Sequence, residues 1–86
     1  MYFVYVLLSF KDKELYIGYT EDVPHRVGQH LLGEVQSTRN RLPLQLIYYE
    51  AYTDKRDAKG REKFLKGGSG HTYLKKQLNH FFNVHS

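Results

Sequence analysis

The chain has no cysteine and no tryptophan among its 86 residues, and it has only two prolines. Without cysteine, disulfides and thiolate chemistry are excluded, and a reducing cytoplasm suits the chain. No apolar run reaches the length of a membrane-spanning helix, and the start at Met1 lacks the basic stretch and apolar core of a secretion signal. We therefore expect one cytoplasmic domain over residues 1–86, with no membrane contact.

Positive charge is concentrated in one segment of the sequence. Residues 55–76 carry eight Lys or Arg against Asp57 and Glu62, a net charge of +6, whereas the whole chain is only +4. A one-sided basic surface favours a polyanion such as nucleic acid. A solvated helix with solubilising lysines explains the same charges, so charge alone leaves both interpretations open.

Three segments have the composition of strands. Residues 2–9 and 15–19 are rich in β-branched and aromatic side chains and are separated by a short charged segment, which predicts a β-hairpin. Residues 44–52 have the same character and predict a third strand. Between them, residues 33–43 are mostly polar and are expected to form a loop.

Helices are predicted on either side of the third strand. Asp22 is placed to cap a first helix, which ends at Gly33. The buried face of this helix is expected to contain Val23, Val27 and Leu31. A second helix over 54–66, capped by Asp54, contains Gly60 despite its cost. A third is expected over 71–82, with Leu74, Leu78 and Phe81 on one face. The order ββαβαα predicts an α+β fold, a three-stranded antiparallel sheet flanked by three helices.

Glu62 is the side chain that packing alone explains least. In the helix over 54–66 it lies on the same stripe as Ala58 and Leu65, so the carboxylate is expected to be partly buried. A buried charge needs a partner or a metal. The alternative is a structural ion pair with Arg26 or a lysine.

Other known motifs are not supported. The glycine-rich residues 67–70 lack the preceding strand and the lysine of a nucleotide-binding loop, so no nucleotide cofactor is expected there and a turn between helices is favoured. The five histidines have no cysteines to complete a zinc site. His25 is expected to point away from Arg26 and His30, which are four residues apart.

Several short motifs occur in an order that resembles a known family. They are Phe3-Val4-Tyr5, Tyr16-Ile17-Gly18, the run from Tyr19 to Arg26 followed by His30, and Arg61-Glu62-Lys63. Over about residues 2–78 the chain resembles the GIY-YIG nuclease superfamily, in particular small standalone bacterial members related to the N-terminal domain of the excision-repair nuclease. The first tripeptide lacks the family's glycine, and a C-terminal asparagine is not clearly placed, Asn79 being the one candidate.

The resemblance implies metal-dependent hydrolysis of a phosphodiester and assigns roles to residues. Glu62 would hold one Mg²⁺ or Mn²⁺ ion. Arg26 would bind phosphate oxygens, His30 would either donate to a phosphate oxygen or relay a proton, and Tyr5 or Tyr16 would take a proton from water. The residues predicted as catalytic are Tyr5, Tyr16, Arg26, His30 and Glu62, with Gly18 as a structural part of the site and Arg39, Arg41, Lys63 and Lys66 as contacts to nucleic acid.

The predicted function is therefore a divalent-metal-dependent endonuclease that cuts DNA, in repair or in the processing of structured DNA. RNA as the substrate stays open, as does a protein partner or added factor that supplies specificity. The alternative is a nucleic-acid-binding module of the same fold with weak or absent catalysis. A protein-interaction domain is a third interpretation and rests only on the aromatic content, eight Tyr and five Phe.

Overall fold

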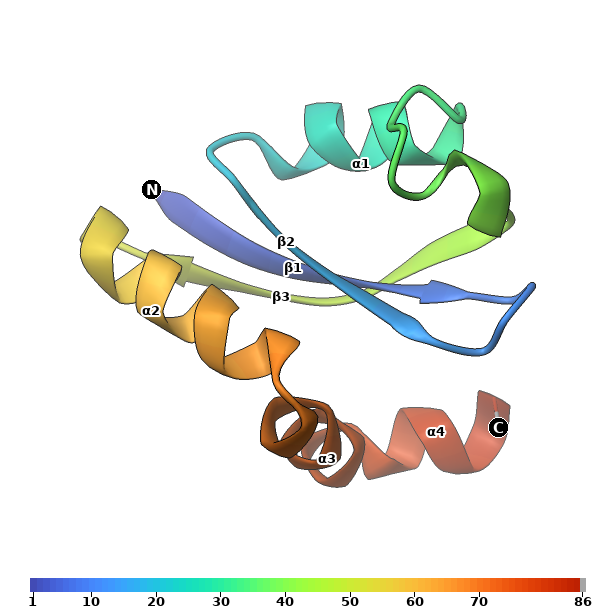
Figure 1. Ribbon diagram of the computed structural model, residues 1–86. Helices are drawn as coiled ribbons and strands as arrows, with labels where there is room; N and C mark the ends of the chain where they lie inside the picture. The colour runs from blue at the N-terminus through green and yellow to red at the C-terminus, as the bar shows by residue number, and fades with distance from the viewer. Residues whose placement is uncertain (86) are drawn as a thin grey trace.

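A three-stranded antiparallel sheet forms the middle of the molecule (Figure 1). The computed structural model describes residues 1–85, with side chains to residue 84. Strands β1 (Tyr2–Ser9) and β2 (Leu15–Thr20) form the predicted hairpin, and β3 (Leu44–Tyr52) pairs with the other edge of β1. The sheet order is therefore β2-β1-β3, with β1 in the centre.

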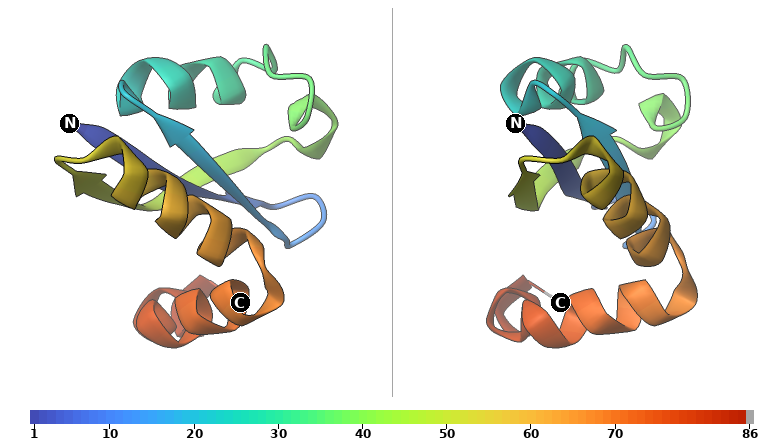
Figure 2. Two further views of the ribbon diagram at one scale, coloured as in Figure 1. Left: turned by 60° about the vertical axis from the view of Figure 1, so that its left-hand side comes forward. Right: turned by 90° about the vertical axis from the view of Figure 1, so that its left-hand side faces the viewer.

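Helices cover both faces of this sheet. Figure 2 shows α1 (Val23–Leu31) on one side, and α2 (Lys55–Lys66), α3 (Gly68–Gln77) and α4 (Asn79–His85) on the other. The predicted α+β class and the antiparallel sheet with flanking helices are confirmed. None of the helices in the described chain is both long enough and apolar enough to span a membrane.

Alternation along β1 divides the core into two clusters. Val4, Val6 and Leu8 pack toward α2 and α3 against Ala58, Leu65 and Leu74 among others. Tyr5 and Leu7 point to the opposite face and pack with Val23, Val27 and Leu44. Because successive strand residues face opposite sides, one buried strand supplies both clusters. The same alternation puts Tyr5 on the α1 side.

The buried face of α1 differs from the prediction. Asp22 caps the helix by accepting a hydrogen bond from the His25 backbone N–H, and Gly33 follows its end with φ of +76°, as expected for a glycine that stops a helix. Leu31, however, is 48% exposed, and His30 is fully buried in its place. On a helix, the residues three and four positions after Val27 can both face the sheet, so His30 can take the place expected for Leu31. There the His30 ring forms hydrogen bonds with Tyr5 and Thr38.

The C-terminal region contains two helices where one was predicted over 71–82. α3 begins at Gly68, within the segment expected to be a turn, and it ends before Leu78, which leaves helical geometry with φ of −105° and ψ of 32°. Gly70 lies against the backbone of Phe64 and Leu65 so closely that a side chain at this position would overlap it. Gly70 therefore allows the first turn of α3 to pack directly on the end of α2.

The segment 33–43 is less irregular than its polar composition predicts. It contains a short 3₁₀ helix, η1 (Arg39–Arg41), and it buries Val35 and Thr38. The Arg39 N–H donates to the Val35 carbonyl at 2.9 Å and the Arg41 N–H to the Thr38 carbonyl at 2.8 Å. This loop therefore folds back onto the α1 side of the sheet, and backbone hydrogen bonds fix the position of Thr38.

Candidate active site

Tyr5 and Gly18 face one another across the β1–β2 ladder. The Tyr5 side chain lies over Gly18, and a Cβ added at Gly18 would collide with two atoms of the ring and with the hydroxyl oxygen. The only register shift in the described sheet is between Val6 and Leu7, so Gly18 does not mark a bulge. Its missing side chain instead lets the Tyr5 ring cross β2.

A chain of hydrogen bonds runs from Tyr5 through His30 to the loop. Tyr5 Oη and His30 Nε2 lie 2.7 Å apart, and His30 Nδ1 and Thr38 Oγ1 also lie 2.7 Å apart. All three side chains are buried. Both nitrogens of the imidazole are thus occupied by protein groups, which leaves His30 no direct contact with a substrate.

Tyr5 and His30 are both uncharged near neutral pH. Burial raises the pKa of Tyr5 to about 12, because hydrogen bonding and charge from Arg26 lower it less than burial raises it; the charges of Tyr16 and Glu62 add to the rise. Burial, together with the positive charge of Arg26, lowers the pKa of His30 to about 4. A neutral imidazole therefore contacts a protonated phenol.

Arg26 and Tyr16 surround this pair. Arg26 is half-buried and donates from Nη1 to Gln29 Oε1 at 3.1 Å, and it lowers the pKa of Tyr5. It also lines an open depression together with residues 34–37. The Tyr16 ring lies 5.0 Å from the His30 ring and 6.3 Å from the Tyr5 ring, measured between centroids. The two tyrosines and the histidine thus form one aromatic cluster beside the guanidinium.

Glu62 lies on α2 and is partly buried. Its side chain is 14% exposed and forms ion pairs with Lys66, at 3.0 Å, and Lys59, at 3.8 Å. Its charge contributes to the raised pKa of both Tyr5 and Tyr19. The carboxylate is therefore partly buried, as predicted, and the lysine partner that the sequence left open is present. Both lysines are more than half exposed, and such pairs add little stability.

The possible metal ligands of this site suit a hard cation that needs few protein ligands. Within the described chain there is no group of three His, Asp or Glu side chains that can hold a metal. Glu62 would be the protein ligand, with water and phosphate supplying the remaining oxygens, an arrangement typical of Mg²⁺. The carboxylate has the required chemistry.

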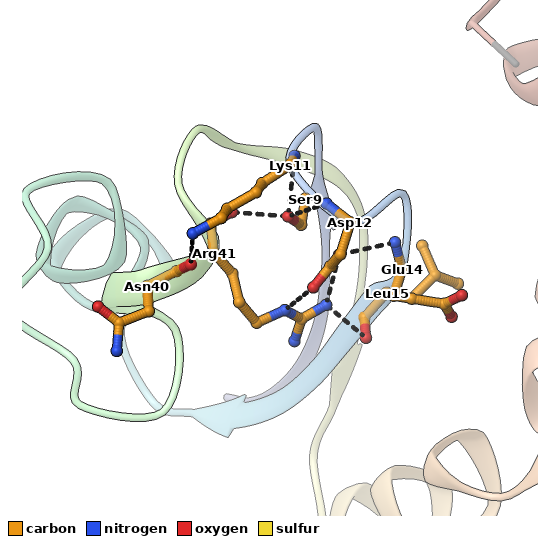
Figure 3. A network of polar contacts seen from close by, with 7 residues as sticks. All are labelled: Ser9, Lys11, Asp12, Glu14, Leu15, Asn40 and Arg41. Carbon is orange, nitrogen blue, oxygen red and sulfur yellow. Dashed lines mark hydrogen bonds and ion pairs between the residues drawn. The ribbon is translucent and has the colours of Figure 1, made fainter.

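The residues predicted to contact nucleic acid lie in different places. Lys63 and Lys66 are exposed on α2, and Arg39 is exposed on η1. Arg41 instead joins the hairpin turn, where its Nε donates to Asp12 Oδ2 at 2.7 Å and its carbonyl accepts from Ser9 Oγ at 2.6 Å (Figure 3). Arg41 is thus engaged in a structural contact, which the sequence did not indicate.

Thr38 is the member of the cluster that the sequence does not predict. A threonine in a polar loop usually bonds to nearby backbone. Val35, a buried apolar residue three positions earlier, is the one local sign that this loop packs against the core. His25, which was expected to point away from Arg26 and His30, is exposed.

Comparisons with known proteins agree with this arrangement. The family model of the GIY-YIG catalytic domain matches residues 1–79. A UPF0213 protein of Lacticaseibacillus paracasei is 41% identical over 71 residues, 81% of this chain and 79% of the relative. A UPF0213 protein of Haloquadratum walsbyi is 39% identical over 77 residues, 88% of this chain and 82% of the relative.

A solved structure is similar as well. The solution NMR structure of a UPF0213 protein from Bacillus halodurans is 32% identical, with a TM-score of 0.57 over 91% of this chain and 86% of that chain. Sequence and fold thus agree over most of the length of both chains. The chain therefore belongs to the family of the GIY-YIG catalytic domain, a nuclease-type fold.

Proposed function

We propose that the protein is a divalent-metal-dependent endonuclease that hydrolyses phosphodiester bonds in DNA. The observation that carries the proposal is the Tyr5–His30 hydrogen bond of 2.7 Å, in a cluster that also includes Arg26 and is electrostatically coupled to Glu62. Phosphodiester hydrolysis needs an activated water, a cation to offset charge on the phosphate, and a stabilised leaving oxygen. The cluster contains a candidate for each.

Tyr5 is the better candidate for the residue that accepts a proton from water. With a pKa of about 12 it does not ionise by itself near neutral pH, so the proton must leave it during the reaction. The water O–H bond breaks as a new bond forms to Tyr5 Oη, and the original Tyr5 proton passes to His30 Nε2. The neutral, buried His30 lies 2.7 Å from Tyr5 Oη, which supports that relay over donation to phosphate. Tyr16 packs beside the pair.

Arg26 and Glu62 complete the proposed site. The Arg26 guanidinium, beside Tyr5 and at the edge of an open depression, would bind phosphate oxygens and offset their developing charge. Glu62 would hold one Mg²⁺ or Mn²⁺ ion, which supplies a Lewis acid for the phosphate and its leaving 3′-oxygen. Lys59 and Lys66 would release the carboxylate to the ion. The lack of cysteine is consistent with action in the cytoplasm.

The ion pairs of Glu62 favour a second candidate, a nucleic-acid-binding module with weak or absent catalysis. If Lys66 keeps the carboxylate, as its distance of 3.0 Å allows, Glu62 is a structural residue and no metal is held. The two functions differ in one observable, metal-stimulated cleavage. Binding of DNA is expected from both.

The deciding experiment is a cleavage assay with single-stranded, duplex, flapped and branched DNA and with RNA, with and without Mg²⁺ or Mn²⁺. We expect metal-stimulated cleavage by the wild type and a loss of at least about 100-fold in Glu62→Gln, the size of effect seen when a group that stabilises the transition state is removed. Glu14→Gln, an exposed acid in the hairpin turn, is the matched control and should cleave normally. Absence of wild-type cleavage on every substrate would favour the binding module.

A further inference from the structure

Both ring nitrogens of His30 are occupied, but a neutral imidazole carries only one proton. Two arrangements satisfy the distances of 2.7 Å on each side. In the first, Nδ1–H donates to Thr38 Oγ1 and Tyr5 donates to Nε2. In the second, Thr38 donates to Nδ1 and Nε2–H donates to Tyr5 Oη.

We propose that Thr38 is a positioning residue: its hydroxyl accepts from His30 Nδ1–H and thereby holds His30 in the tautomer whose Nε2 is free to accept the proton of Tyr5. The inference rests on the proposed function, because only that reaction requires Nε2 as an acceptor. It adds a residue of the loop between α1 and β3 to a site otherwise formed by β1, β2, α1 and α2.

The Tyr5 hydroxyl favours the first arrangement. In the second, the Tyr5 oxygen accepts from Nε2–H, and the buried O–H of the phenol has no acceptor among the described residues. In the first, that O–H donates to Nε2, and the lone pairs of the oxygen stay free for the positive charge of Arg26, which lowers the pKa of Tyr5.

The charged intermediate gives a second argument. Once His30 has taken the Tyr5 proton, both ring nitrogens are donors, and the buried Nδ1–H needs an acceptor. Thr38 Oγ1 is the acceptor at 2.7 Å. In the first arrangement it already accepts before the transfer, so neither the ring nor the hydroxyl has to turn. In the second, Nε2 carries a proton and cannot receive another.

Backbone hydrogen bonds of the loop fix the position of Thr38. Its N–H donates to the Val35 carbonyl at 3.1 Å, and its carbonyl accepts from the Arg41 N–H at 2.8 Å. The backbone around η1 thus fixes the hydroxyl opposite Nδ1. Groups that orient a histidine through its second nitrogen typically change activity 10–100-fold when removed, as measured for partners of metal-binding histidines.

The first test reads the tautomer and does not depend on activity. Proton–nitrogen correlation spectra of ¹⁵N-labelled protein identify which nitrogen of His30 carries the proton. We expect Nδ1–H in the wild type and in Thr38→Ser, which keeps the hydroxyl, and a shift toward Nε2–H in Thr38→Val. A wild-type spectrum with the proton on Nε2 would overturn the proposal, whether or not the valine variant folds.

The second test is cleavage by the same three proteins. We expect kcat to fall about 10–100-fold in Thr38→Val with little change in KM, and Thr38→Ser to restore most of it. Equal activity of Thr38→Val and wild type would contradict the positioning role. If the wild type does not cleave any substrate, the proposed function fails, and the spectra still decide the tautomer.

Discussion

The His30 side chain has no solvent-exposed surface, because β1, β2 and the loop carrying Thr38 cover it. Burial lowers its pKa to about 4 from the ordinary value of 6.5. A buried neutral histidine is favourable for a proton relay, since it can accept a proton transiently without holding one at rest. The same burial makes the fold sensitive to acid.

The sign of that sensitivity follows from proton uptake. As pH falls below 6.5, the unfolded chain protonates His30 while the folded chain does not until near pH 4, so acid favours unfolding. The stabilising contribution is complete above pH 6.5 and is lost progressively toward pH 4. At pH 5 we expect the free energy of unfolding to be about 2 kcal/mol lower than at pH 7.5.

Urea denaturation at both pH values measures this loss. In His30→Gln, which cannot titrate, the difference between pH 7.5 and pH 5 should shrink by most of that amount. His25→Gln, an exposed histidine on the same helix, should keep the wild-type difference. Burial raises the pKa of Glu50, but hydrogen bonds from Arg61, Tyr48 and Tyr52 lower it by more, so the pKa lies below its usual value. Glu50 therefore affects stability only at lower pH. Equal pH dependence in His30→Gln and wild type would refute the assignment.

At the level of elements, the register of the hairpin sets the position of Tyr5. The ladder pairs Tyr5 with Gly18, and the Tyr5 ring occupies the volume that any larger residue at position 18 would need. Gly60, in contrast, lies on the exposed side of α2 with open space around its Cα. The same substitution should therefore have opposite effects at these two glycines.

We expect Gly18→Ala to destabilise the fold by about 1–3 kcal/mol, because the Tyr5 ring must shift within a packed core. Cleavage should fall further than stability, since the Tyr5–His30 distance changes. Gly60→Ala should stabilise the fold by about 0.5–1 kcal/mol through helix propensity and leave cleavage unchanged. Thermal unfolding and the cleavage assay test both variants, and a neutral Gly18→Ala would argue against the tight contact.

The elements also show what the sequence can predict. The bounds of β1 and β3 were predicted to the residue, because β-branched and aromatic runs end at charged or turn-forming residues. Leu31 was misplaced because an amphipathic stripe does not distinguish steps of three and four residues. The break at Leu78 and the contact of Thr38 with His30 depend on tertiary packing, which no local pattern encodes.

At the scale of the whole molecule, the excess of positive charge lies on one side of the sheet. The segment 55–76 forms α2 and most of α3, on the side away from α1 (Figure 2). Arg61 is bound by Glu50 at 2.9 Å, and Arg56 by Asp54 at 2.8 Å. The remaining cations of the segment are exposed lysines, namely Lys55, Lys59, Lys63, Lys66, Lys75 and Lys76. Lysines are point charges and suit contacts with phosphate that do not read sequence.

Binding to DNA through these lysines should depend steeply on salt. If about four of them neutralise phosphates, the logarithm of the affinity falls with the logarithm of salt concentration with a slope of about −3.6, so affinity drops about 100-fold between 50 and 200 mM. Fluorescence anisotropy with a labelled duplex and EDTA, which prevents cleavage, measures the slope. Lys63→Gln with Lys75→Gln should make it less steep by about two. Lys13→Gln, in the hairpin turn, should leave the slope unchanged. A wild-type affinity that does not change with salt would mean that α2 and α3 do not bind the DNA.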